Sequence, residues 1–109
     1  MTDARGAAAP LEGFQRKHLR KLAHGLKPVV SVGGAGVSEA VTRALDEALA
    51  QHELVKVKLH QPDDKKAAAA ELARVAHAEL CGLVGHTVIL FRRNEERPRI
   101  ELPARPSSR

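Results

Sequence analysis

Two spacings of apolar residues alternate along this chain, and each predicts a different kind of element. Between Leu54 and His60, valine and leucine alternate with lysine and histidine, the period-two pattern of a strand with one buried face. Elsewhere apolar residues recur every three or four positions, which predicts helices over 11–24, over 38–51 and from about 63 to 80. Short apolar runs predict further strands at 29–32 and 87–91, with a two-residue candidate at 83–84.

Local signals place the ends of these elements. Ser38 is a good helix N-cap, and Glu39 after it suits the positive end of the helix dipole. Gly25 is a plausible stop for the first helix, and Gly82 is expected to end the third. Pro62 and the two aspartates after it predict a turn and a helix start.

The predicted order is helix, strand, helix, strand, helix, strand, strand. Such alternation predicts a single α/β domain with a four-stranded mixed sheet and βαβ crossovers, and 109 residues suit one domain. We expect residues 1–10 to be a disordered N-terminal segment, 11–102 the folded domain and 103–109 a disordered basic tail. Ile100 and Leu102 are candidates to dock back on the core.

The amino-acid composition limits the classes of partner and the cellular location that we expect. Net charge is +5, from 18 Lys and Arg against 13 Asp and Glu, which favours a polyanionic partner over a neutral one. One cysteine, no apolar segment long enough to span a membrane and no signal peptide together predict a cytoplasmic protein without membrane contact. Phe14 and Phe91 are the two aromatic residues, which argues against stacking of bases on exposed rings.

Gly33, Gly34, Ala35 and Gly36 directly follow the strand at 29–32 and precede the helix at Ser38. Glycine lets a foreign backbone come close, and a helix start offers unpaired N–H groups to an anion. The loop lacks the Lys-Ser/Thr of a P-loop and does not complete the dinucleotide fingerprint, so a tight turn without a ligand stays open.

The surrounding charge favours phosphate. No Asp or Glu lies between Gly13 and Ser38, and the cations expected to meet RNA phosphate are Arg16, Lys17, Arg20, Lys21 and Lys27, with Lys56 and Lys58 as weaker candidates. A solvated basic surface is the alternative. Whether the basic helix, the strand lysines and the glycine loop share one face is left open by the sequence.

The residues offer little for catalysis. The histidines lack a short metal-ligand spacing, Cys81 is expected to be inert packing, and no nucleophile and base stand out. We therefore expect no metal, no cofactor, no small-molecule substrate and no enzymatic activity.

Several segments in order resemble a known family. Residues 15–30 (QRKHLRKLAHGLKPVV), 33–39 (GGAGVSE), 52–58 (HELVKVK) and 85–92 (GHTVILFR) resemble the CRM domain, named for chloroplast RNA splicing and ribosome maturation, in its stand-alone bacterial YhbY form. The resemblance covers about 11–102. It implies three helices on a four-stranded mixed sheet, a fold like that of the C-terminal domain of translation initiation factor three.

The resemblance also implies a function. Such domains bind RNA, and their Gly-x-x-Gly loop, here 33–36, is the proposed contact, similar in chemistry to the backbone-clamping loop of KH domains. Single-domain bacterial members associate with precursors of the large ribosomal subunit, so we expect large-subunit ribosomal RNA or its precursor as the partner. The alternatives are a protein-binding adaptor on the ribosome and an RNA chaperone or intron-splicing factor.

Overall fold

Three helices and four strands alternate along residues 11–104, the part of the chain that the computed structural model describes. In chain order they are α2 (Gly13–Ala23), β1 (Val30–Val32), α3 (Glu39–His52), β2 (Leu54–Leu59), α4 (Lys65–Ala76), β3 (Glu79–Val84) and β4 (Thr87–Phe91). The predicted fold class and element order are confirmed. None of the helices in this range has the length and apolar character to cross a membrane.

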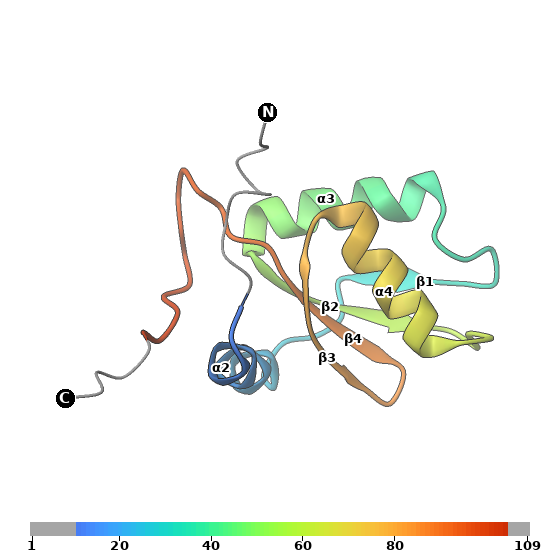
Figure 1. The fold of residues 1–109 in the computed structure, drawn as a ribbon. Helices are drawn as coiled ribbons and strands as arrows, with labels where there is room; N and C mark the ends of the chain where they lie inside the picture. Colours follow the sequence, from blue (N-terminus) through green and yellow to red (C-terminus); the bar gives the residue numbers. More distant parts are fainter. Residues whose placement is uncertain (1–10, 105–109) are drawn as a thin grey trace.

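The strands form one mixed sheet in the order β1-β2-β4-β3. β1 runs parallel to β2, while β4 runs antiparallel to both of its neighbours, so β2 and β3 point the same way. The crossovers β1-α3-β2 and β2-α4-β3 therefore move in the same direction across the sheet. Because such crossovers are right-handed, α3 and α4 lie on one face, and α2 lies on the other (Figure 1).

Alternation along the strands builds a core on each face. Val55, Val57 and Leu59 of β2 pack with Val88 and Leu90 of β4 under α3 and α4. The opposite face holds a smaller core beneath α2, made of Leu11, Leu19, Ala23, Leu54, Cys81, Ile89 and Phe91. Because α2 is one short helix, it leaves part of its face of the sheet uncovered, and Lys58 and Ser31 of that face are exposed.

Most predicted bounds agree with the structure to within a residue or two. Ser38 is the N-cap of α3 and its side chain accepts a hydrogen bond from the Val41 amide. Asp64 caps α4 in the same way through the Ala67 amide. The strand predicted at 87–91 is observed over that range.

The helix predicted over 77–80 is wrong, and the strand predicted at 83–84 is present but longer than predicted. The third helix ends at Ala76, not near Leu80, because His77 adopts a left-handed backbone with φ 53° and its amide bonds back to Ala73 and Arg74. β3 is a full six-residue strand instead of a two-residue one, since pairing with β4 outweighs the helical spacing of its apolar residues. Gly82 does not end a helix; it pairs with Ile89 next to a shift of register in β3.

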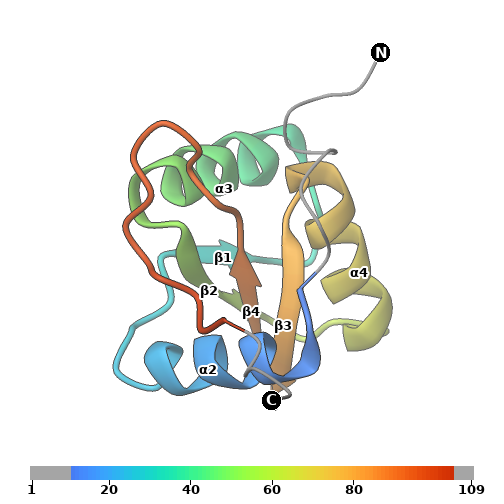
Figure 2. The same ribbon diagram turned by 60° about the vertical axis from the view of Figure 1, so that its left-hand side comes forward.

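The segment after β4 is held to the body by one buried carboxylate. Glu53 is fully buried, and its side chain accepts hydrogen bonds from the amides of Asn94, Arg99 and Ile100 at 2.7–2.8 Å. The segment then returns to α2, where the Pro103 carbonyl accepts from Gln15 (Figure 2). The docking expected of Ile100 and Leu102 is confirmed, since both pack on the α2-side core. The predicted disordered segment 1–10 and residues 105–109 of the predicted tail lie outside the described residues.

Candidate nucleic-acid interface

Helix α2 separates its apolar and basic residues onto two sides. Leu19 and Ala23 are buried against the sheet, whereas Lys17 and Lys21 are exposed. Lysines one turn apart lie on the same side of a helix, so these two form a short basic ridge. The basic side predicted for this helix is therefore present at the surface.

A groove runs between this ridge and the uncovered part of the sheet. Its volume is about 670 Å³. Among the described residues its walls carry no carboxylate: they are formed by Lys17, Arg20, Lys21, His24, Lys56, Val84, Thr87 and Ile89. We call it the α2 groove. Its α2 side is cationic, and we call the largely apolar part of its sheet side, Val84, Thr87 and Ile89, the floor.

Arg20 is fixed in the wall of the α2 groove by contacts with β3. Its Nη1 donates to the Cys81 carbonyl oxygen at 2.8 Å, at the place where the register of β3 shifts. Its side chain lies over Gly82, where an added Cβ would come within 2.8 Å of Arg20 Cδ. The absence of a side chain at Gly82 thus makes room for Arg20.

Arg16 and Lys27, also predicted to contact RNA, lie outside the α2 groove. Arg16 donates to the Leu11 carbonyl at 2.7 Å and lies 3.4 Å from a carboxylate oxygen of Glu79. These contacts engage both terminal nitrogens of its guanidinium group. Lys27 is exposed in the connection between α2 and β1.

The two strand lysines lie on the same face of the sheet as α2. Lys56 lines the α2 groove, and its Nζ donates to the Leu26 carbonyl oxygen at 3.1 Å. Lys58 is exposed and pairs across the strands with Thr87, another residue of the groove. Cross-strand partners point to the same face. The question left open by the sequence is settled for these groups: the basic helix and both lysines share a face.

The predicted glycine loop is a tight turn with an open surface. The Gly36 amide donates to the Gly33 carbonyl at 3.0 Å, and Gly36 has φ +77°, which favours glycine. A Cβ at Gly33, Gly34 or Gly36 would meet no atom within 4 Å. Gly33, Gly34 and Ala35 are exposed. The loop can therefore be approached closely by another molecule, as predicted.

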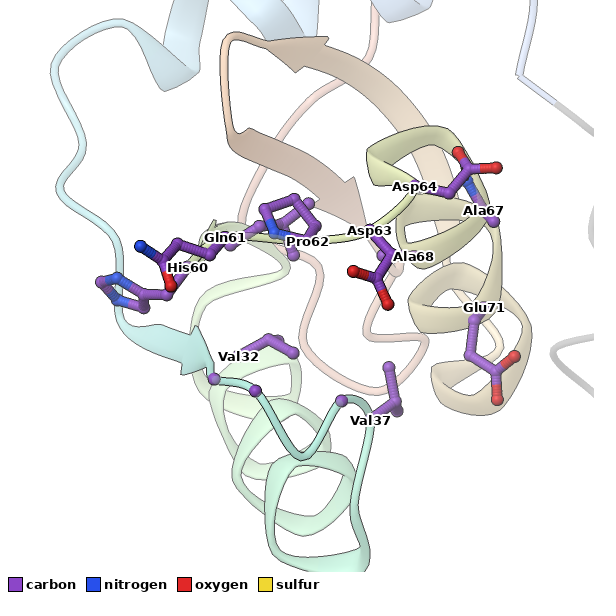
Figure 3. Close-up of a pocket in the computed structure, with 14 residues that line it drawn as sticks. Val32, Val37, His60, Gln61, Pro62, Asp63, Asp64, Ala67, Ala68 and Glu71 are labelled. Atoms are coloured by element: carbon purple, nitrogen blue, oxygen red, sulfur yellow. The ribbon is translucent and has the colours of Figure 1, made fainter.

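The loop lines a different pocket, and the charge there differs. This loop pocket, of about 440 Å³, is formed by the glycines, Val32, Val37, residues 59–64 and three residues of α4, Ala67, Ala68 and Glu71. Asp63, Asp64 and Glu71 line it on the side of α4, and His60 lies on the side of β1 (Figure 3). Carboxylates repel phosphate, so an anion has an open approach mainly from the His60 side.

Strand β2 connects the α2 groove to the loop pocket. Lys56 of β2 lines the groove, Lys58 follows two residues later on the strand, and His60, directly after the end of β2, lines the pocket. Alternate residues of a strand point to one face with a spacing of about 7 Å. The His60 amide also bonds to the Val32 carbonyl, which precedes the loop. Lys56, Lys58 and His60 thus lead from the groove toward the glycines.

Cys81 is 2% exposed, and burial raises the pKa of its thiol to about 12, so it is a poor nucleophile. No group of His, Cys, Asp and Glu within 11–104 is arranged to hold a metal ion.

Sequence reasoning missed the floor of the α2 groove and the role of Glu53. Val84 and Thr87 come together there only because β3 is a full strand paired with β4. The motif Leu-Val-Gly-His-Thr-Val at 83–88, apolar residues around a Gly-containing turn, was a hairpin signal that points to it. No local signal marks Glu53, whose partners lie more than 40 residues away.

Comparison with known proteins agrees with this architecture. The model of the CRS1 / YhbY (CRM) domain matches residues 11–92. The chain is 36% identical over 95 residues to YqeI of Bacillus subtilis, named a probable RNA-binding protein, covering 85% of this chain and 99% of that one. A Haemophilus influenzae protein named as RNA-binding is 38% identical over 91 residues, covering 82% and 91%. A solution structure from Staphylococcus aureus superposes with a TM-score of 0.75 at 35% identity, covering 85% of this chain and 99% of that one.

Proposed function

Because the chain belongs to the CRS1 / YhbY (CRM) domain family, we propose that it is an RNA-binding protein that grips the RNA backbone and has no enzymatic activity. The names of its relatives support RNA as the partner. The net charge of +5 supports a polyanion of any kind.

One observation carries the mechanism: the α2 groove gathers Lys17, Lys21 and Lys56 with no carboxylate among its lining residues. Phosphates that lie along this surface release counterions, which is the main source of affinity in such complexes. Lys58 extends the contact along β2. Arg16 and Arg20 serve first as ties between α2 and β3, and add their charge to the same face.

The glycine loop takes a second, smaller part. RNA leaving the groove along Lys58 reaches the loop from the His60 side, where Gly33, Gly34 and Ala35 are exposed. Such a contact fixes the path of the backbone and carries no base specificity. Lys27 adds charge near the entry to β1.

The target that we propose is the precursor of the large ribosomal subunit in the cytoplasm. This step rests on the resemblance to single-domain members of the family, and the chain carries one copy of the domain. Backbone capture suits such a role because a folded ribosomal RNA presents phosphates at high density.

The first test measures RNA binding directly. Affinity for fluorescein-labelled large-subunit ribosomal RNA fragments is measured by anisotropy from low to physiological salt, for wild type and for Lys17→Gln/Lys21→Gln. Arg43→Gln/Arg93→Gln is the matched control, since it removes two exposed positive charges outside the groove and the loop pocket. Two lost phosphate contacts should flatten the slope of log K against log salt by about 1.4. A slope unchanged from wild type, or an equal change in the control, contradicts the assigned surface.

The second test asks about the target. Sedimentation of the tagged protein from a lysate at low and high salt should place the wild type in precursor large-subunit fractions at low salt and release it at high salt. If the protein binds RNA fragments but stays at the top of the gradient, RNA binding stands and the ribosomal target is ruled out.

The loop pocket supports a second candidate, an adaptor that holds a basic protein segment. Its floor includes Val32, Val37 and Leu59, and its rim carries Asp63, Asp64 and Glu71. These groups complement lysine or arginine side chains, which ribosomal proteins have in abundance. Partner capture that is lost in Asp63→Asn/Glu71→Gln and unaffected by ribonuclease would favour this candidate.

A further inference from the structure

We infer that the α2 groove receives an unpaired RNA base, so that the protein prefers single-stranded RNA to duplex. This inference rests on the proposed function and deepens it, because it names the form of RNA that the same surface selects. The sequence argued against stacking, since Phe14 and Phe91 are the two aromatic residues and neither lines the groove. The structure supplies other surfaces for a base.

The floor of the α2 groove is apolar and accessible. Val84 is 64% exposed and lies beside the partly exposed Thr87 at the end of the β3–β4 hairpin, whereas Ile89 next to them is 3% exposed and belongs to the core. An exposed apolar surface ringed by lysines is a poor match for the backbone alone, because phosphate and ribose do not bury against it. The flat face of a base can bury against such a surface. The volume of the α2 groove, about 670 Å³, lies in the range of small-molecule sites.

Arg20 offers a planar partner within this groove. Guanidinium planes stack on unpaired bases in RNA complexes much as aromatic rings do. The hydrogen bond to the Cys81 carbonyl and the packing over Gly82 hold Arg20 in place before any ligand arrives. A group ordered in advance loses less conformational entropy on binding.

The charges around the groove fit a strand whose base points inward. Lys17 and Lys21 lie on the α2 side and Lys56 on the sheet side, so phosphates on either side of the inserted base meet a cation. A duplex keeps its bases paired and stacked, so it gains these ionic contacts without the contact to the floor. Electrostatics alone would favour the duplex, whose charge density is higher.

The test compares one RNA strand of about 12 nucleotides with the blunt duplex formed with its complement, a length within the usual site size of single-strand binders. Binding of both is measured by anisotropy at physiological salt. Wild type should bind the single strand at least about tenfold more tightly than the duplex, given the usual contribution of one stacked base. Val84→Ser should weaken single-strand binding about fivefold and leave duplex binding within about twofold.

Val29→Ser is the matched control, because Val29 is also an exposed valine, at 53%, and does not line the groove. Arg20→Lys is a second variant, which keeps the positive charge and loses the planar guanidinium group. It should reduce affinity for the single strand and leave the slope of log K against log salt unchanged. Equal affinity for strand and duplex, or a Val84→Ser variant that behaves as Val29→Ser does, overturns the inference while RNA binding stands. A wild type that binds neither RNA overturns the proposed function as well.

Discussion

The α2 groove and the loop pocket lie on the same small domain, yet they are built in different ways. The loop pocket is built around one local motif, the turn closed between Gly33 and Gly36, and residues between Leu59 and Glu71 complete it. The α2 groove joins residues far apart in the chain, since Arg20 bonds to Cys81 and Lys56 to the Leu26 carbonyl. A sequence motif therefore reveals the turn of the loop pocket, whereas the contacts that assemble the α2 groove carry no local signal.

Their charges differ as well. The residues that line the groove include cations and no carboxylate, whereas the loop pocket has three carboxylates on one side. A glycine-rich turn permits close approach, but the sign of the surrounding charge decides which partner approaches. The contrast teaches that the loop with the stronger motif need not be the stronger phosphate contact.

The largest effect is expected where tertiary contacts hold the α2 side together. Glu53→Ala leaves the amides of Asn94, Arg99 and Ile100 without their buried acceptor, so unfolding free energy should fall by about 3 kcal/mol. Urea denaturation measures the change. Glu95→Ala, at an exposed position, should change stability by less than about 0.5 kcal/mol. Equal stability of the two variants would show that the segment after β4 is not held by Glu53.

The next effect concerns the groove itself. Lys17→Gln/Lys21→Gln removes two phosphate contacts and should weaken RNA binding about tenfold at physiological salt. Anisotropy titration measures it, and thermal unfolding should be unchanged because both lysines are exposed. A loss confined to one RNA sequence would speak against backbone contact, since phosphate contacts carry no sequence information.

A smaller effect should follow from charge placed in the loop. Gly33→Asp/Gly34→Asp fits the backbone, because neither residue has a positive φ and an added Cβ meets no atom within 4 Å. Repulsion of phosphate should weaken binding about fivefold. Gly33→Ala/Gly34→Ala is the neutral control and should bind as wild type does. Wild-type affinity in the aspartate variant would show that the loop is a turn that does not contact RNA. Gly36 is left unchanged because its φ of +77° would strain any other residue.

The smallest effect tests the acidic side of the loop pocket. Asp63→Asn/Glu71→Gln removes two carboxylates and retains Asp64, the cap of α4. If RNA passes the loop, its affinity should rise about twofold to threefold as repulsion falls. A fall in affinity would instead indicate that these carboxylates contact the RNA.

Much of the fold followed from the sequence because its signals are local. The period-two spacing of 54–60, the caps at Ser38 and Asp64 and the apolar run 87–91 each fix an element through nearby atoms. Residues 79–80 were taken as helix instead of strand because Leu80 follows Ala76 at the four-residue spacing of a helix. Pairing with β4, which no local window contains, decided between them.

The sequence by itself determined the element order, the family and the residue types able to meet phosphate. Periodicity, helix caps and motifs are set by residues close together in the chain, and the net charge is the sum of all charged residues, so all of them can be read without a structure. Tertiary structure alone decided which of those residues act together: right-handed crossovers placed α3 and α4 on one face and left the other to α2. The groove between α2 and the sheet, the anchoring of Arg20 and the burial of Glu53 all follow from that packing.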